Sequence, residues 1–323
     1  MSQITITQVV AMFGAYYVQN RANMNNLIQQ IYQAEKTASF FRLMPTMSTI
    51  YERSTSELGE VLQKYQPDFT PKGDVTFKGE QYLLPWLKVD VEYVPDTLVQ
   101  SWLGFLAGSG YEKEKYPFIK WFMENHLIPK MKEDFEKAIY MGVDGTVTPG
   151  TATTALAVMD GIRKQINDYV ADVNSGINII ATGALDNDDK IFVKQIEDFC
   201  DQIAEKFDGI SMELFMRPSR YKSYRRGRRA LYNENYAQVS DSELLDVEDT
   251  NIKVVKSPSM ATSDKIWMSP AKNRARPVRM PKDKQIIGME RVVRKVQMYT
   301  DWHEGACFET PIYIWTNDLD TTP

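Results

Sequence analysis

Two stretches of alternating apolar and polar residues lie in the first third of the chain. Residues 75–78 alternate, Gly79 and Glu80 interrupt the pattern, and residues 83–93 resume it after a turn-rich lead-in over residues 65–74. Two alternating runs joined by a glycine-containing turn predict a two-stranded β-ribbon. Such a ribbon alone is only marginally stable in water. The chain must therefore fold so that this ribbon lies on another surface.

A long helix is predicted directly downstream of the ribbon. Apolar residues keep a helical spacing from Pro117, which suits a first helical turn, to Gly142, which suits a helix C-cap. Pro129 falls inside this pattern and should kink or split the helix. We therefore expect a bent helix of roughly 25 residues, well above the mean length of a helix.

A narrow apolar stripe predicts another helix over residues 18–36. Its members recur at the spacing i, i+3, i+4 and i+7, and they are Met24, Leu27, Ile28 and Ile31. Because the rest of this segment is polar, it cannot form a core of its own and must pack against another element. Residues 1–16 show no such pattern and are expected to be irregular.

The middle of the chain alternates between helices and strands. The sequence predicts helices over residues 154–170, 190–207 and 219–231, and strands over residues 177–181 and 210–216. The chain then returns to strands, which are predicted over residues 252–255, 266–268, 292–299 and 312–315. Since no flexible Gly/Ser linker separates these segments, we expect domains that interleave along the chain.

Composition is that of an ordinary globular protein. Of the 323 residues, 43% are hydrophobic and 25% are charged, and the net charge of −5 is too small to indicate a dedicated charged partner. The sequence contains no apolar run of membrane-spanning length and no secretory signal at its N-terminus. The only two cysteines, Cys200 and Cys307, favour free thiols in a reducing compartment. We therefore expect a protein made inside a cell and without a membrane partner.

Residue patterns typical of catalysis or ligand binding are few. His126 and His303 belong to no zinc-binding motif, and the segment 108–110 lacks the third glycine and the preceding strand of a dinucleotide loop. Residues 185–190 cluster carboxylates, which fit a helix N-cap better than a calcium loop. No nucleophile elbow and no Walker loop occurs. The sequence thus predicts no enzyme, no cofactor and no metal site.

One run of positive charge is unusual. Seven cations lie within residues 217–229, beside two tyrosines: Arg217, Arg220, Lys222, Arg225, Arg226, Arg228 and Arg229. Cations beside aromatic rings suit a nucleic-acid surface. The downstream carboxylates at positions 241, 243, 246, 248 and 249, or those of a neighbouring subunit, would equally serve as ion-pair partners. Local or intersubunit ion pairing is the favoured interpretation, with DNA contact and a solvated face as alternatives.

The order of the elements is more informative than any single motif. It runs from a helical arm through a long ribbon, a long helix and an α/β middle to closing strands. This order resembles the major capsid proteins of tailed bacteriophages, the Hong Kong 97-like fold. Local sequence agrees, since residues 134–142 resemble the end of that family's spine helix and residues 216–218 (Met-Arg-Pro) resemble its turn into a helix. Residues 256–273 resemble part of its axial domain.

The resemblance implies an α+β fold with four regions. These are an N-terminal arm over residues 1–60, an extended β-ribbon (the E-loop) over 61–94, a peripheral domain with a spine helix over 95–149 and 282–323, and an axial domain over 150–281. It also implies a structural role. Copies of the chain would assemble into pentamers and hexamers of an icosahedral head that encloses double-stranded DNA, in a virion assembled in the host cytoplasm.

The resemblance also implies partners. The surfaces expected to join subunits are the ribbon residues Lys72, Phe77, Lys78, Tyr82, Leu84 and Trp86 and the arm residues Met24, Leu27, Ile28 and Ile31. A portal would occupy one vertex, decoration proteins would bind the shell, and DNA would touch it without sequence preference. Because the arm carries no long, charged, coiled-coil-like segment, we expect a separate scaffolding protein.

Two other functions stay open at this point. An encapsulin-like compartment would use the same fold to hold an enzyme cargo. A nucleic-acid-binding protein would instead use the basic helix that contains Arg217 and Arg229.

Overall fold

The computed structural model describes residues 6–32, 36–112, 116–203, 205–207, 209–232, 245–247, 250–279 and 287–321. The α-helices are α1 (Ile6–Phe13), α2 (Arg21–Tyr32), α3 (Pro95–Ser109), α4 (Phe118–Phe122), α5 (Ile128–Met141), α6 (Ile162–Ala171), α7 (Asp189–Asp201) and α8 (Pro218–Tyr232). The strands are β1 (Arg42–Thr46), β2 (Ile50–Leu58), β3 (Val75–Leu83), β4 (Trp86–Tyr93), β5 (Asn178–Ile179), β6 (Met212–Met216), β7 (Leu245–Asp246), β8 (Ile252–Lys256), β9 (Trp267–Ser269), β10 (Arg274–Arg279), β11 (Gly288–Val292), β12 (Lys295–His303), β13 (Cys307–Phe308) and β14 (Trp315–Thr316). This mixture confirms the predicted α+β class.

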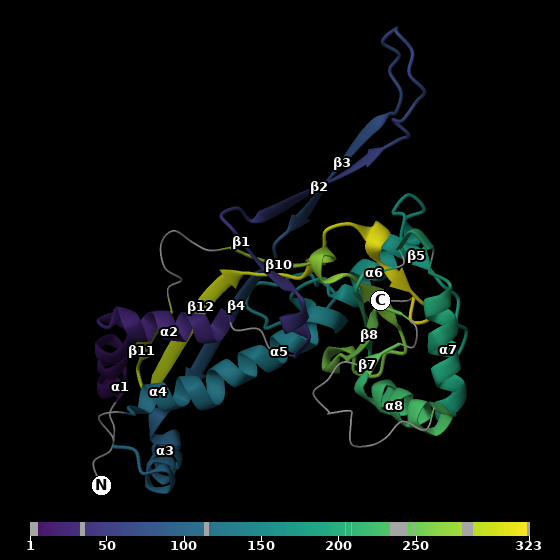
Figure 1. Ribbon diagram of the computed structural model, residues 1–323. Coiled ribbons are helices and arrows are strands. Elements are labelled where there is room, and N and C mark those ends of the chain that lie inside the picture. Colours follow the sequence, from purple (N-terminus) through teal and green to yellow (C-terminus); the bar gives the residue numbers. More distant parts are fainter. Residues whose placement is uncertain are drawn as a thin grey trace.

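The strands form four sheets, which Figure 1 shows in one view. A six-stranded sheet has the order β5-β14-β9-β6-β8-β7, and we call it, with α6, α7 and α8, the sheet part. An antiparallel sheet of order β11-β12-β4 forms, with α1 to α5, the spine part. The sheet β1-β10-β13 lies between the two parts, and β2 and β3 form a ribbon that projects away from the body.

The predicted long helix is present and is interrupted as expected. A π-helical turn, Met123–Leu127, joins α4 to α5, and the N–H of Ile128 bonds to the carbonyl of Met123, five residues back. A proline inside a helix lacks an N–H and clashes with the preceding turn. The π turn places Pro129 in the first turn of α5, where that N–H is not required.

Gly142 ends α5, but for a reason other than the one predicted. Its φ is −61°, so it does not adopt the left-handed conformation of a glycine cap. A Cβ atom at this position would instead lie 2.5 Å from the carbonyl oxygens of both Ala138 and Met159. The glycine is therefore required by the close packing of a following loop on the end of the helix.

The pairing predicted for the ribbon is wrong. Strand β3 pairs with the preceding strand β2, in the register Ile50↔Leu83 to Leu58↔Val75, and Gly79 and Glu80 lie inside β3 rather than in a turn. Strand β4 belongs to the spine part, where it pairs with β12. The ribbon therefore spans residues 50–83, with its tip at residues 59–74, and the predicted range 61–94 misses its first strand.

The N-terminal arm is more ordered than predicted. Residues 6–16, expected to be irregular, lie in α1 and in a π-helical turn, Gly14–Val18. Met24 and Leu27 of α2 are buried with Trp102, Phe118 and other residues of the spine part, as their spacing predicted. The arm therefore packs on its own subunit along at least this face.

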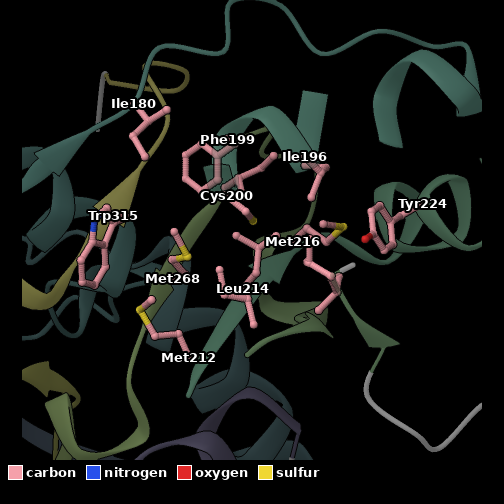
Figure 2. Close-up of a cluster of buried hydrophobic side chains, with 14 of the residues drawn as sticks. Ile180, Ile196, Phe199, Cys200, Met212, Leu214, Met216, Tyr224, Met268 and Trp315 are labelled. Carbon is pink, nitrogen blue, oxygen red and sulfur yellow. The ribbon is translucent and has the colours of Figure 1, made fainter. Parts of the chain in front are cut away.

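The six-stranded sheet is buried on both faces. Figure 2 shows one face, where Leu214 and Met268 of the strands meet Phe199 and Tyr224 of α7 and α8. The next residue of β6, Phe215, packs on the opposite face with residues of α5 and α6. Alternate side chains of one strand thus fill two cores, and the sheet lies between two helical layers.

Two further predictions are confirmed, and one predicted helix begins later than expected. Asp188 caps α7 by accepting the N–H groups of Lys190 and Ile191, and both cysteines are free and buried. The helix predicted over residues 154–170 begins only at Ile162. The range 282–323, predicted to belong to the peripheral domain, contributes β14 to the six-stranded sheet, where it pairs with β5 and β9.

Replacing Gly227 by alanine is expected to destabilise the protein. A Cβ atom at Gly227 of α8 would lie 2.0 Å from the carbonyl oxygen of Asp189 and 2.6 Å from Val193 in α7. Alanine favours a helix, but forcing two packed helices apart costs more, so we expect a net loss of about 2 kcal/mol in the free energy of unfolding. Urea unfolding measures it.

The matched control is Gly104→Ala in α3. Apart from its chain neighbours and the adjacent backbone of its own helix, no atom of the described residues lies within 4 Å of a Cβ at Gly104, so alanine there should raise the free energy of unfolding by about 0.5 kcal/mol. Changes of the same sign in both variants would contradict the close contact between α7 and α8.

Candidate interaction surface

The tip of the ribbon is a loop held in shape by polar contacts. The N–H of Gly59 donates to the carbonyl of Asp74 at 3.0 Å and closes the base of the loop. Lys72 donates to the carbonyl of Leu62 at 2.7 Å and pairs with Glu60 at 3.1 Å. These hydrogen bonds and this ion pair across the loop give the tip a defined conformation, although the tip has no hydrophobic core.

Gly73 is required for this conformation. Its φ of +95° is disfavoured for any residue with a side chain, and a Cβ there would lie 2.8 Å from Val61 Cγ1 and 3.1 Å from the carbonyl oxygen of Glu60. The glycine thus lets the two arms of the loop approach each other closely.

The apolar side chains of the tip face solvent. Leu62, Tyr65 and Phe69 are 88%, 90% and 94% exposed, and Phe77 of β3 is 74% exposed. Single exposed apolar residues are common, but a group of them on one projecting and preorganised element marks an interaction site. We therefore regard the ribbon tip as the candidate interaction surface.

The base of the ribbon rests on the body. The hydroxyl of Tyr51 donates to Glu309 at 2.7 Å, and the ring of Tyr82 packs so closely on Gly305 that a Cβ there would lie 2.5 Å from the tyrosine oxygen. Burial raises the pKa of both Tyr51 and Tyr82 above the ordinary range, so these hydroxyls stay protonated. The same face of the ribbon carries Arg53, whose side chain is also largely buried.

The residues predicted to join subunits lie in different environments. Lys72 is at the tip and Phe77 is exposed, whereas the side chain of Lys78 lies outside the described residues. Tyr82 packs on its own subunit, as shown above. Leu84 is only 3% exposed and is buried in its own chain, which removes it as a contact between folded subunits.

Trp86 is exposed but belongs to β4 rather than to the ribbon. It is 69% exposed, stacks on His303 with ring centroids 5.3 Å apart, and donates its indole N–H to Asp301 at 2.8 Å. His303 is therefore engaged with an aromatic ring. In the described part of the chain, no group of three or more potential metal ligands comes together.

The arm residues predicted as contacts are only partly described. Met24 and Leu27 are buried in the spine part, so they do not face a neighbour in this conformation. Ile28 and Ile31 belong to the same helix, and their side chains lie outside the described residues.

Most cations of the basic helix form ion pairs or hydrogen bonds within their own subunit. Arg217 and Arg220 both pair with Asp264 at 2.9 Å, and Arg220 also donates to the carbonyls of Leu185 and Asp186. Two cations thus share one carboxylate, and backbone carbonyls supply the remaining acceptors of a side chain that is 7% exposed.

The other arginines of this helix have partners as well. Arg226 lies 3.4 Å from Asp189, and Arg228 donates to the carbonyl of Asp246. Arg225 and Arg229 also interact with neighbours. The acidic positions 241, 243, 248 and 249 lie outside the described residues. Local ion pairing is therefore present at Arg217, Arg220 and Arg226, through carboxylates other than those predicted.

The sequence did not single out Leu62, Tyr65 or Phe69. They lie in a segment whose prolines and polar residues predict turns, and a loop normally exposes polar side chains. The available signal was the presence of large apolar residues in a segment with no periodicity that would bury them.

The described residues show no membrane-spanning element. None of the helices within them is both long and apolar enough to cross a bilayer.

Several solved structures share this fold, although no protein-family model and no curated protein sequence matches the chain. A chain of the satellite phage P4 procapsid, in a structure that includes the size determination (Sid) protein, aligns with a TM-score of 0.55 at 11% identity, over 92% of this chain and 98% of that one. The capsid of a native GTA particle aligns with a TM-score of 0.52 at 10% identity, over 86% and 88% of the two chains. The capsid of cyanophage A-1(L) aligns with a TM-score of 0.50 at 11% identity, over 87% and 90%.

Proposed function

Because the chain has the Hong Kong 97-like capsid fold, we propose that it is the major capsid protein of a tailed bacteriophage. The observation that carries this proposal is the projecting ribbon, which presents Leu62, Tyr65 and Phe69 to solvent on a preorganised tip. A tip of this kind gains stability only when another surface covers it. A second copy of the chain supplies that surface in a shell.

In this proposal the subunits form pentamers and hexamers of an icosahedral head around double-stranded DNA. The ribbon, corrected to residues 50–83, overlays a neighbour, and the spine and sheet parts act as the peripheral and axial domains. The scaffolding protein, the portal, decoration proteins and non-specific DNA contacts complete the assembly. Exposed parts of the helix that contains Lys222 and Arg226 are the candidate DNA contact.

Electron microscopy of the purified full-length protein tests the proposal. The protein is expressed alone and together with the candidate scaffolding protein, and the samples are examined in negative stain. Closed shells, rings of five or six subunits, or sheets are the expected result. A monomer under every condition would contradict a shell function.

The contents of the particles separate a virion from a compartment. Particles formed during infection should contain nuclease-protected, double-stranded DNA. Particles that instead enclose one enzyme and no DNA would replace the proposal by an encapsulin-like function.

A further inference from the structure

Arg53 connects the ribbon to two elements of the body. Its guanidinium lies 2.8 Å from the carboxylate of Glu80 on the paired strand β3 and donates to the hydroxyl of Tyr169 in α6 at 2.9 Å. It also donates to the backbone carbonyl of Phe308 in β13. The Arg53 side chain is 9% exposed, so all three contacts are shielded from water.

The position of Arg53 in the ribbon makes these contacts directional. Arg53 lies directly opposite Glu80 in the register, in the part of the ribbon that contacts the body. A guanidinium is planar and donates along fixed directions, so the two acceptors and the paired carboxylate around it define its orientation. A buried arginine is also costly to leave unpaired. Any change in the angle of the ribbon must therefore break at least one of these contacts.

We propose that Arg53 is the positioning residue that sets the angle between the ribbon and the body, and that it couples this angle to the position of α6. The coupling runs through Tyr169, which belongs to the helical layer beneath the six-stranded sheet. The consequence for assembly rests on the proposed function. The geometry itself is a property of the single subunit and can be measured there.

The distance between the tip and the body reports this angle. Spin labels at Lys64→Cys in the tip and Lys194→Cys in α7 give that distance in the full-length subunit by pulsed electron paramagnetic resonance. Both sites are exposed. Burial raises the pKa of the two native thiols to about 12, so only the added cysteines react.

Arg53→Ala should broaden the distance distribution about twofold, because the ribbon loses its fixed contact with the body. Arg53→Lys retains the charge next to Glu80 but not the planar fork, and should give an intermediate width. The matched control is Glu52→Ala, which alters an exposed neighbour on the opposite face of β2 and should leave the distribution narrow. Thermal unfolding establishes that each variant is folded.

Tyr169→Phe provides an independent variant if Arg53→Ala does not fold. It removes one hydrogen bond and keeps the ring, and it should also broaden the distribution. An unchanged distribution in folded Arg53→Ala, or in Tyr169→Phe where Arg53→Ala does not fold, would overturn the positioning role.

Assembly separates this inference from the proposed function. A broadened distribution together with normal shells would support the role of Arg53 and count against the ribbon as the assembly element. An unchanged distribution in a protein that forms shells would overturn the role of Arg53 alone.

Discussion

The triple variant Leu62→Ser, Tyr65→Ser, Phe69→Ser is expected to fold normally and to form no closed shells. These side chains are 88%, 90% and 94% exposed in the subunit, so their removal takes away no contact of the folded chain. The ties that shape the tip involve Gly59, Asp74 and other polar partners, and the variant keeps them. The stability of the monomer should therefore be unchanged.

The expected effect on assembly is large. Burying a large apolar side chain contributes about 2 kcal/mol, so in the proposed shell three of them would contribute about 6 kcal/mol to each intersubunit contact. A loss of that size weakens each contact by about four orders of magnitude. Because every subunit of a closed shell makes the contact, the loss recurs throughout the shell and prevents its completion.

Sedimentation and electron microscopy measure the outcome, and a polar variant of the same loop provides the control. Lys64→Ser and Gln66→Ser change exposed residues between the three apolar ones and should leave the yield of shells nearly unchanged. Shells of normal yield from the apolar triple variant would remove the ribbon tip from the assembly mechanism.

The strand that the sequence missed shows why the ribbon was misassigned. Among the described strands, β2 pairs only with β3, and of its described side chains only Tyr51 and Arg53 make contacts with the body that exclude water. A strand with little burial has no reason to alternate apolar and polar residues. Strand β4 does alternate, because Val89, Val91 and Tyr93 pack against the core of the spine part. The visible pattern was therefore assigned to the ribbon, although it belongs to a sheet in the body.

Long helices and local caps were predictable because their causes are local. The stripe of α5, the proline at its start and the cap at Asp188 each depend on residues within a few positions. The partners of the basic helix were not predictable, since Asp264 lies far along the chain and reaches Arg217 and Arg220 only through the fold. Predicting contacts between distant segments requires knowledge of the topology. The order of the elements indicated the topology only because it resembles that of a known fold.

Replacing Glu304 by alanine is expected to destabilise the subunit by about 4 kcal/mol. Glu304 and Arg276 are 2% and 3% exposed and form an ion pair, and Glu304 also accepts the indole N–H of Trp302 at 2.9 Å. Removing the carboxylate takes from a buried guanidinium the carboxylate that it pairs with, which is far more costly than the loss of a surface pair. Urea unfolding of the variant measures the effect.

Two controls test this explanation. Glu92→Ala breaks the exposed pair with Lys295 in the spine part and should change stability little. The double variant Arg276→Met, Glu304→Leu removes both charges and should recover most of the lost stability, since apolar side chains can replace a buried pair. A double variant as unstable as Glu304→Ala would show that lost packing, rather than an unpaired charge, causes the effect.

The pair of Glu304 and Arg276 lies where several elements of the subunit meet. Glu304 follows β12 of the spine part, bridges to Val278 of β10, and donates its N–H to the carbonyl of Pro85, just after the ribbon ends. The guanidinium of Arg276 also lies 5.5 Å from the ring centroid of Phe135 in α5. The segment that follows the ribbon, helix α5 and the sheet β1-β10-β13 thus meet around one buried charge pair. Glu304→Ala should therefore raise hydrogen exchange first at this junction, and uniform exchange across the subunit would show that the pair stabilises the fold without joining these elements in particular.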